Sequence, residues 1–422
     1  MNQEINKLKR SIAVALLIIV FAIVILFVFF SRSFASLTVL PSSASLSIDG
    51  EKITLTDAGI GKKNVVPGVH HIEAQAEGYV GQNFDLEFKR GFMRNVSIEL
   101  KKIPEPVSIS TKATFLSKGR DFNDSFYLSS DGKTIYHMKA GVGDDGALQV
   151  LENRPITNNR LSNIKEIIWS PTKELALFRK NDASITLFDF MKYDFLNQTE
   201  IPWGTNIKSV AWSPDNSRIA YVFEPGNGER SIIFSNITNT EMTRVLSLEE
   251  KGLDNPILRW SPDSRRLLLI NQSVDPTMNN IYVFDSYSKK LTQVTDTGNQ
   301  IDAQFSPDGN MILYSTFSKS PETPTSSVLS VMNIDGSDKQ ALGIRAELSK
   351  AVWKDNKSIL YATFNTETKK ESIAGFSVVD KQPDGFVIGD LGKVFIETMM
   401  LSSDSKFLLY QTSEGIYALK VN

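Results

Sequence analysis

The sequence predicts an all-β protein: a seven-bladed β-propeller preceded by a small β-sandwich or barrel domain and one N-terminal transmembrane helix. Three observations support this fold class. A long apolar run lies near the N-terminus, a region of alternating apolar and polar residues follows it, and a large apolar residue followed by a polar turn then recurs in seven stretches. The expected parts are a cytoplasmic tail (1–10), a transmembrane anchor (11–31), a small β domain (36–102), a linker (103–108) and the propeller (107–422).

Composition excludes several functional classes. The 422 residues carry 46 basic and 48 acidic side chains, so the chain has no basic excess for binding nucleic acid. It contains no cysteine, which excludes disulfides, thiolate metal sites and cysteine nucleophiles. A chain of this length is long enough to form several hydrophobic cores.

The first expected element is a membrane anchor at Ile12–Phe30, a run of 19 residues without a polar side chain. A helix rises about 1.5 Å per residue, so the run covers the roughly 30 Å hydrocarbon core of a bilayer. Lys7, Lys9 and Arg10 precede the run, and only Arg32 follows it closely. The positive-inside rule then leaves the N-terminus in the cytoplasm and the bulk of the chain outside the plasma membrane.

A cleaved signal peptide is the alternative interpretation of this run, because Ser33-Phe34-Ala35 has the small-x-small pattern of a cleavage site. The apolar region of a signal peptide is usually shorter, extending over roughly 7–15 residues. We therefore expect an uncleaved, single-pass anchor.

The next expected element is a small β domain, because apolar and polar residues alternate from Leu37 onward between hairpin turn signals. Its motifs are Pro41 with Ser43-Ala44, Ile48-Asp49-Gly50, Pro67-Gly68-x-His70 and Gly78-Tyr79. They resemble the PEGA domain, a β module of surface-exposed bacterial and archaeal proteins, although Ser43 replaces a glycine and residues 59–63 replace the usual Gly-x-Thr-Pro. The resemblance implies an extracytoplasmic location and no chemistry.

The propeller prediction rests on seven related stretches spaced by 41, 43, 48, 45, 48 and 48 residues. A period in the forties with strand-type content is typical of propellers, in which each repeat forms one four-stranded blade. Each stretch opens with a large apolar residue, which we expect to pack between neighbouring blades. These residues are Leu128, Trp169, Trp212, Trp260, Phe305, Trp353 and Leu401.

Each stretch continues through a turn, most often Ser-Pro-Asp, into an apolar strand. Proline fixes φ and removes a hydrogen-bond donor, so it ends the first strand. The aspartate is suited to accept hydrogen bonds from nearby backbone N–H groups. We therefore predict a structural role for the turn aspartates, which are Asp131, Asp215, Asp263, Asp308 and Asp404.

These stretches resemble the TolB-type propeller repeat, in which aromatic-Ser-Pro-Asp-Gly precedes Ile-Ala-Phe or Ile-Leu-Tyr. The chain departs from it at Thr172, which replaces the aspartate, and after Trp353, where the turn is shortened; leucine replaces the aromatic residue at both ends. The resemblance implies the propeller fold. TolB-type propellers are soluble periplasmic parts of a cell-envelope complex, and the predicted anchor argues against a direct equivalent of them.

The segment before the first repeat is expected to link the domains and then to close the ring. Pro104 and Pro106 favour a stiff, extended linker over residues 103–108. The sequence given ends at Asn422 directly after the third strand of the last repeat, and residues 107–116 have strand character. We expect this segment to supply the missing outer strand, which also removes an exposed edge.

The sequence lacks the common catalytic motifs His-Glu-x-x-His, Gly-x-Ser-x-Gly and the Walker loop. His137 is the only histidine of the propeller region, so a catalytic triad is not expected. The adjacent His70 and His71 would point to opposite faces of a strand and could not readily share a metal. We expect a protein that is not an enzyme and that needs neither a metal nor a cofactor.

The rim of the propeller channel is where we expect ligand contact. The residues three positions before each aromatic residue are mostly polar, with Ile257 as the exception. The candidate channel-rim contacts are Glu166, Ser209, Asp302, Lys350 and Thr398. Ordinary polarity at the start of a strand is the alternative explanation of this column.

Together these features predict a membrane-anchored extracytoplasmic scaffold that presents a propeller to a protein, a peptide or a cell-wall polymer. Two alternatives remain open: a structural component of a surface layer or of adhesion, and a hydrolase or lyase that uses carboxylates in the propeller channel. Buried titratable groups gathered in one pocket would favour the enzyme. Ordered self-association without a specific partner would favour the structural component.

Overall fold

A computed structural model describes most of the chain, which divides into two compact units. Unit 1 spans Met1–Ile103 and unit 2 spans Pro104–Asn422. The described residues are 12, 14–22, 32–103, 105–111, 113–118, 124–143, 148–158, 160–172, 174–180, 189–226, 228–296, 298–320, 323–365, 370–388, 395–402 and 404–421.

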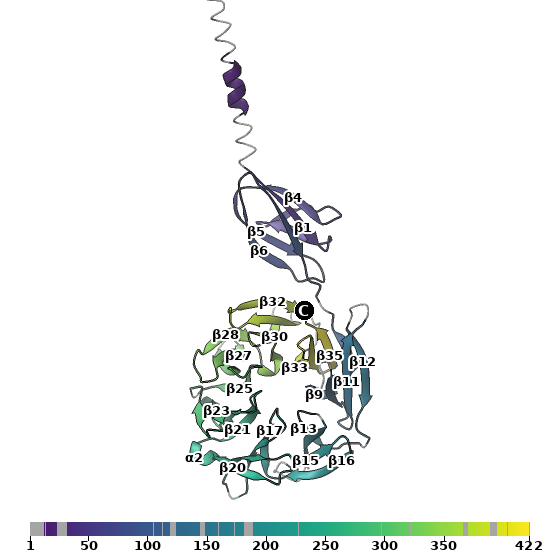
Figure 1. Ribbon diagram of the computed structural model, residues 1–422, viewed down its shortest axis with the longest axis vertical. Coiled ribbons are helices and arrows are strands. Elements are labelled where there is room, and N and C mark those ends of the chain that lie inside the picture. The colour runs from purple at the N-terminus through teal and green to yellow at the C-terminus, as the bar shows by residue number, and fades with distance from the viewer. Residues whose placement is uncertain are drawn as a thin grey trace, which may run out of the picture. The chain divides into compact units, whose positions relative to one another are not determined.

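Unit 1 contains two small sheets that share one hydrophobic core (Figure 1). Leu37 and Val39 of the first sheet are fully buried and belong to the same cluster as Ile72 of the second. The first sheet has the order β4-β1-β7, from β1 (Ser33–Leu40), β4 (Ile60–Val65) and β7 (Met93–Glu99). The second has the order β3-β2-β5-β6, from β2 (Ser45–Ile48), β3 (Glu51–Ile53), β5 (Gly68–Gln75) and β6 (Gln82–Phe88).

The two adjacent histidines of β5 bind different carboxylates. His70 Nδ1 lies 2.6 Å from Asp49 Oδ2, and His71 Nδ1 lies 2.8 Å from Asp85 Oδ1. The hydrogen bond to Asp49 raises the pKa of His70. His70 Nε2 also lies 2.7 Å from the carbonyl oxygen of Val66, so this ring ties two turns of unit 1 together.

The predicted anchor is only partly described. Residues 12 and 14–22 are helical, and the remainder of Ile12–Phe30 lies outside the described residues, as does the predicted cytoplasmic tail (1–10). Within the residues that can be described, no helix combines the length and apolar character that crossing a bilayer requires.

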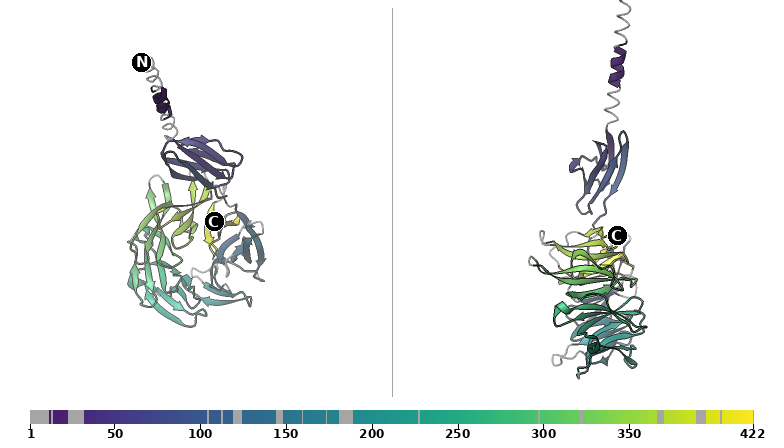
Figure 2. Two further views of the ribbon diagram at one scale, coloured as in Figure 1. Left: turned by 45° about the horizontal axis from the view of Figure 1, so that its top comes forward. Right: turned by 90° about the vertical axis from the view of Figure 1, so that its left-hand side faces the viewer.

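Unit 2 consists of four-stranded antiparallel sheets arranged around a common centre, which is a propeller-like fold (Figure 1, Figure 2). Its described residues contain seven such sheets, and in six of them the strand order follows the sequence. The first strands of neighbouring sheets, such as β13 (Ile164–Trp169) and β17 (Ile207–Trp212), lie next to each other near the centre.

The sheets are numbered here in chain order. Sheet 1 contains β9 (Ala113–Lys118), β10 (Asp124–Ser129), β11 (Ile135–Val142) and β12 (Leu148–Pro155). Sheet 2 contains β13, β14 (Leu175–Lys180), β15 (Asp189–Asp194) and β16 (Thr199–Gly204). Sheet 3 contains β17, β18 (Ile219–Phe223), β19 (Ser231–Ser235) and β20 (Met242–Ser247), and the short helix α2 (Leu248–Lys251) follows it.

Sheet 4 contains β21 (Asn255–Trp260), β22 (Arg266–Gln272), β23 (Asn280–Asp285) and β24 (Leu291–Gln293). Sheet 5 contains β25 (Gln300–Phe305), β26 (Met311–Ser320), β27 (Thr323–Asn333) and β28 (Gln340–Arg345). Sheet 6 contains β29 (Ala351–Trp353), β30 (Ser358–Asn365), β31 (Lys370–Ser377) and β32 (Gln382–Ile388). Sheet 7 contains β33 (Ile396–Leu401), β34 (Phe407–Thr412), β35 (Gly415–Lys420) and β8 (Val107–Thr111). Single 3₁₀ turns occur at Pro276–Met278 and Leu348–Lys350.

Apolar side chains fill the space between neighbouring sheets. The second strands are apolar runs buried on both faces; the four residues from Leu267 to Ile270, for example, are fully buried. Each described buried cluster of unit 2 combines residues from two adjacent sheets, as where Phe234 of sheet 3 packs with Trp260 of sheet 4. The prediction that the recurring aromatic residues pack between sheets is confirmed for the four tryptophans Trp169, Trp212, Trp260 and Trp353.

The ring closes between sheet 7 and sheet 1. β8 pairs with β35 and supplies the outer strand of sheet 7. In the adjoining core, Ile109 of β8 packs with Tyr127 of sheet 1 and Phe407 of sheet 7. The predicted closing segment, residues 107–116, is correct for Val107–Thr111 and wrong beyond it, because the chain must cross to sheet 1 and enters β9 at Ala113.

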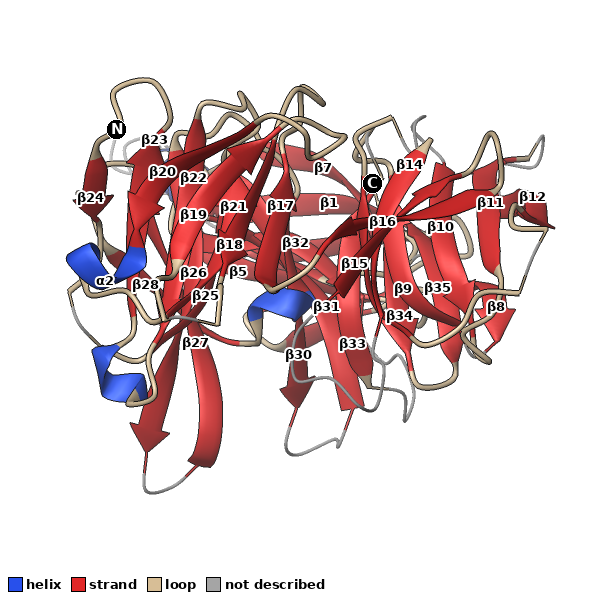
Figure 3. Cartoon of the chain, turned by 90° about the horizontal axis from the view of Figure 1, so that it is seen from below, coloured by secondary structure: helices blue, strands red, loops and turns tan. Residues whose placement is uncertain are grey.

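β26 and β27 form a hairpin that projects beyond its neighbours (Figure 3). They have 10 and 11 residues, and their pairing extends from Met311 opposite Asn333 to Ser320 opposite Thr323. This hairpin extends one side of the ring.

Replacing Ile109 with alanine is predicted to destabilise the ring at its closing strand. Ile109 is 7% exposed, and truncating a buried isoleucine to alanine costs about 2–5 kcal/mol. We expect a lower midpoint of thermal unfolding for the full-length chain. Ser108→Ala, which changes an exposed residue of the same strand, is the matched control and should leave the midpoint unchanged. Equal midpoints for the two variants would contradict the closing role of β8.

Candidate functional site

The antiparallel strands give unit 2 two distinct faces. In sheets 2 to 7 each first strand ends in the repeated turn, so that turn lies on one face, which we call the turn face. In sheet 1 the corresponding turn follows the second strand, β10, instead. The first strands begin on the opposite face, where the hairpins between second and third strands also lie; we call it the hairpin face. Four of the five candidate rim residues are the third residues of six-residue first strands, and Lys350 directly precedes the first strand of sheet 6.

Glu166 and Ser209 both bind other groups of the protein. Glu166 Oε2 lies 3.0 Å from Arg179 Nε on the adjacent strand. Although 44% of the Glu166 side chain is exposed, burial around its carboxyl group raises its pKa, and the charge of Arg179 opposes that rise. Ser209 Oγ accepts a hydrogen bond from the N–H of Leu258 at 3.1 Å, which links sheet 3 to sheet 4.

Asp302 links sheet 5 to sheet 4. The guanidinium group of Arg259 lies 2.8 Å from one carboxylate oxygen of Asp302 and donates to the other at 3.0 Å. Arg259 also donates to the carbonyl oxygen of Ala303. Ile257, the apolar member of the column, packs against the core between these two sheets. This edge of the ring therefore combines a forked ion pair with apolar packing.

Lys350 neutralises a buried carboxylate. Its Nζ donates to Glu371 Oε1 at 2.8 Å, and Glu371 is only 3% exposed. The other carboxylate oxygen of Glu371 accepts a hydrogen bond from the N–H of Ile396, so Glu371 links sheet 6 to sheet 7. Thr398, the last candidate, is half-buried and lies opposite Gln411 in sheet 7.

The candidate rim residues thus form links between strands rather than one cluster. Sequence reasoning missed the partners Arg259 and Glu371, and also Gln304, which donates to the carbonyl oxygen of Ala351 at 3.1 Å and joins sheet 5 to sheet 6. Arg259 and Gln304 both directly precede the recurring aromatic residue, and this shared position is the signal that could have identified them. Ligand contact by the five candidates stays a prediction.

The turn aspartates share one hydrogen-bond pattern. Ser306 Oγ donates to Asp308 Oδ1 at 2.6 Å, and the same oxygen accepts from the N–H of Asn310 at 3.1 Å. Burial alone would raise the pKa of Asp308, but these hydrogen bonds outweigh it and lower the pKa. The same pair of bonds occurs at Asp131, Asp215, Asp263 and Asp404.

Some of these turns also bind the next sheet. The backbone N–H of Asp215 donates to Ser264 Oγ at 2.9 Å, and Arg218 donates to the carbonyl oxygen of Ser264 at 2.8 Å. The backbone N–H of Asp308 donates to Asn356 Oδ1 at 3.0 Å. Polar contacts therefore connect neighbouring sheets on both faces of the ring.

An exposed aromatic pair lies on the hairpin face. Phe364 at the end of β30 is 39% exposed, Phe395 just before β33 is 56% exposed, and their ring centroids are 5.6 Å apart. Phe364 pairs in register with Glu371, whose carboxylate holds the N–H of Ile396 next to Phe395. The link between Lys350, Glu371 and Ile396 therefore joins the strand that follows Phe395 to β31, the neighbour of the strand that carries Phe364. Sequence reasoning missed this pair because neither residue belongs to the repeat.

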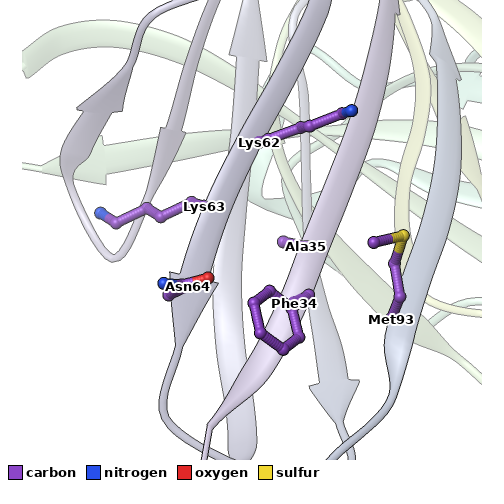
Figure 4. A pocket seen from close by; sticks show the side chains of 6 residues that line it. All are labelled: Phe34, Ala35, Lys62, Lys63, Asn64 and Met93. Atoms are coloured by element: carbon purple, nitrogen blue, oxygen red, sulfur yellow. The ribbon is translucent and has the colours of Figure 1, made fainter. Parts of the chain in front are cut away.

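Unit 1 has a pocket of about 200 Å³ on its three-stranded sheet (Figure 4). Phe34 of β1 lies in register with Asn64 of β4 on one side and with Met93 of β7 on the other. The residues that line the pocket are Phe34, Ala35, Lys62, Lys63, Asn64 and Met93.

Unit 2 contains further pairs of titratable groups. His137 Nδ1 lies 3.6 Å from Glu152, and Lys208 Nζ lies 2.5 Å from Glu224. No three histidine, aspartate or glutamate side chains in the described ranges are grouped so that they could hold a metal ion.

A known protein family matches the propeller part of the chain. The TolB beta propeller domain family (PD40) matches residues 178–415, which is more than half of the sequence. The chain belongs to the TolB β-propeller family. No curated protein sequence is significantly similar to it.

Solved structures that resemble the TolB-type chain have low sequence identity. TolB from Acinetobacter baumannii is 13% identical, with 80% of this chain and 78% of that chain covered and a TM-score of 0.41. An oligogalacturonate lyase from Vibrio parahaemolyticus is 10% identical, with coverages of 76% and 98% and a TM-score of 0.47. The β-propeller domain of the Trilobed protease from Pyrococcus furiosus is 13% identical, with coverages of 75% and 95% and a TM-score of 0.46.

The TolB-type propeller is predicted to lose stability in acid through carboxylates such as Asp285. The backbone N–H of Ser288, together with Arg265, lowers the pKa of Asp285 from 3.8 to about 2. This contribution to stability is present above the unfolded pKa and is lost as the pH falls from about 4 to about 2. Asp285→Asn should therefore lower the thermal midpoint at neutral pH and have much less effect near pH 2. Equal losses at the two pH values would contradict this account.

Replacing Lys350 with methionine is predicted to destabilise the TolB-type propeller by about 3 kcal/mol, because the buried carboxylate of Glu371 loses its cation. Adding Glu371→Gln removes the unpaired charge, so the double variant should be more stable than Lys350→Met alone. Urea unfolding of the full-length chain measures the free energy of unfolding for each variant. If the second substitution restores nothing, the ion pair is not what stabilises this edge of the ring.

Proposed function

We propose that this chain is a membrane-anchored extracytoplasmic binding scaffold whose seven sheets act as one seven-bladed propeller. Its ligand is a protein or peptide that contacts the aromatic pair of Phe364 and Phe395 on the hairpin face. The PEGA-like unit 1 connects the anchor to the propeller, and the role of the propeller is to bind rather than to catalyse.

The exposed aromatic pair is the observation that carries this proposal. Large aromatic side chains are enriched in the cores of protein interfaces, where they bury much area at a low cost in conformational entropy. Phe364 and Phe395 are both more than one-third exposed and stand on adjacent sheets. An apolar anchor of a peptide or protein surface matches such a site.

The links between sheets favour rigid presentation of this pair. Glu371 fixes β31 to β33, and Lys350 keeps its buried carboxylate neutralised. Binding to a preorganised surface avoids part of the entropy loss that ordering a flexible site would require. The site is therefore suited to specific recognition with little rearrangement of the backbone.

The first strand of unit 1 supports an uncleaved anchor at the plasma membrane. Ser33 and Ala35 are 0% and 2% exposed, Ser33 pairs with Val65, and Phe34 pairs with Met93. Cleavage after Ala35 would remove three residues that belong to a sheet. Retention of the apolar run leaves the N-terminus in the cytoplasm and both units outside.

Photo-crosslinking tests the ligand site. A benzoylphenylalanine in place of Phe395 in the full-length chain, expressed in its own envelope, should give a discrete protein adduct. The matched control is Tyr287, which is 75% exposed and lies on the turn face of sheet 4. In a pull-down of that partner with the full-length chain and no crosslinker, Phe395→Ala should lower recovery of the partner about tenfold or more, whereas Tyr287→Ala should not.

The identity of the adduct decides between the proposed function and its alternatives. The same adducts from both positions, or none from position 395, would contradict the proposal. A crosslink between two copies of the chain would instead favour a structural surface-layer component.

A further inference from the structure

The turn between β6 and β7 combines exposed apolar and basic side chains. Phe92 and Met93 are 70% and 60% exposed, and the basic residues of the turn are Lys89, Arg90 and Arg94. No acidic residue occurs among residues 89–94. Large exposed apolar groups interspersed with cations are unusual on a purely aqueous surface.

Three hydrogen bonds fix this turn against the start of β1. The N–H of Gly91 donates to the carbonyl oxygen of Arg32 at 3.0 Å, and the N–H of Phe34 donates to the carbonyl oxygen of Phe92 at 3.1 Å. Ser33 Oγ donates to the carbonyl oxygen of Lys89 at 2.7 Å. Arg32 itself is exposed and follows the apolar run Ile12–Phe30 by two residues. The turn therefore lies directly beside the point where the apolar run joins unit 1.

A second exposed apolar residue lies at the same end. Val66 is 72% exposed and directly follows Val65, which pairs with Ser33. The pocket of unit 1 begins nearby: Figure 4 shows the Phe34 ring between the Asn64 and Met93 side chains. The residues of this end are named the basic tip: Arg32, Val66, Lys89, Arg90, Phe92, Met93 and Arg94.

We propose that the basic tip docks into the headgroup region of an anionic bilayer and holds unit 1 against the membrane surface. The proposal rests on the membrane anchor of the proposed function. A chain that leaves the hydrocarbon at Phe30 reaches Arg32 within about 7 Å, so residues bonded to Arg32 lie at headgroup depth. Aromatic and apolar groups partition into this interface, and lysine and arginine are attracted to anionic lipids.

Charge complementarity identifies anionic lipid as the occupant of this surface. Arg32, Lys89, Arg90 and Arg94 are all exposed, and Lys89, Arg90 and Arg94 flank Phe92 and Met93 along the chain. A zwitterionic surface would bind the apolar groups alone, whereas an anionic one engages both kinds of side chain. Docking should therefore strengthen with the anionic lipid content.

Spin labelling of the full-length chain in vesicles tests the proposal. The sequence contains no cysteine, so Val66→Cys carries a single label without altering the cations or Phe92. Glu77→Cys is the matched control, because Glu77 is exposed in the turn that joins β5 and β6 at the opposite end of the sheet. In vesicles of phosphatidylcholine and phosphatidylglycerol, the label at 66 should be severalfold less accessible to a water-soluble nickel complex than the label at 77.

Charge reversal gives a second measurement. Arg90→Glu should raise the nickel accessibility of the label at 66, whereas Lys101→Glu, at the opposite end of unit 1, should not. The low accessibility at 66 should also rise in vesicles of phosphatidylcholine alone. Equal accessibility of the two labels in anionic vesicles would overturn the proposal. An unchanged nickel accessibility of the label at 66 in the Arg90→Glu variant would also overturn it.

Vesicle flotation separates failure of the tip from failure of the anchor. If the chain floats with vesicles of both compositions while the label at 66 stays in water, the docking proposal is wrong and the anchor stands. If the chain does not float with either kind of vesicle, the anchor of the proposed function fails and the docking proposal fails with it.

Discussion

Apolar packing between neighbouring sheets is the interaction on which unit 2 depends. Each described buried cluster draws its residues from two sheets, so a single sheet has no complete core of its own. Such an arrangement is stable only when the first and last sheets also cover each other. The core that contains Ile109, Tyr127 and Phe407 meets this requirement.

Polar contacts add direction to this non-directional packing. Consecutive links join sheets 3 to 7 through Ser209, Arg259, Gln304 and Glu371. These groups set the register of one sheet against the next, because a displaced neighbour would leave a carboxylate or carbonyl oxygen without its donor. The aromatic pair stands at the sheet 6 to sheet 7 link, where the buried carboxylate gives the surrounding backbone little freedom.

Much of the fold could be predicted from the sequence because each residue type in the repeat has a structural role. An aromatic residue, a turn that ends a strand and an apolar run recur at a blade-length period, so the sheets and the packing of Trp260 could be predicted. The partner of each polar side chain could not be predicted. Arg259 and Asp302, for example, are 43 residues apart, and their contact depends on how two neighbouring sheets are rotated against each other. The contact between Phe364 and Phe395 also depends on how two neighbouring sheets are placed, and no local sequence pattern indicates it.

The pairing of β8 with β35 has a consequence for synthesis of the chain. Ribosomes deliver the N-terminal part first, so β8 leaves the tunnel long before its partner exists. During translation the nascent protein must keep an unpaired edge while the intervening blades assemble in turn. The circle closes only after β35 has been synthesised, and a product truncated before β35 would keep an unpaired strand edge at each open end.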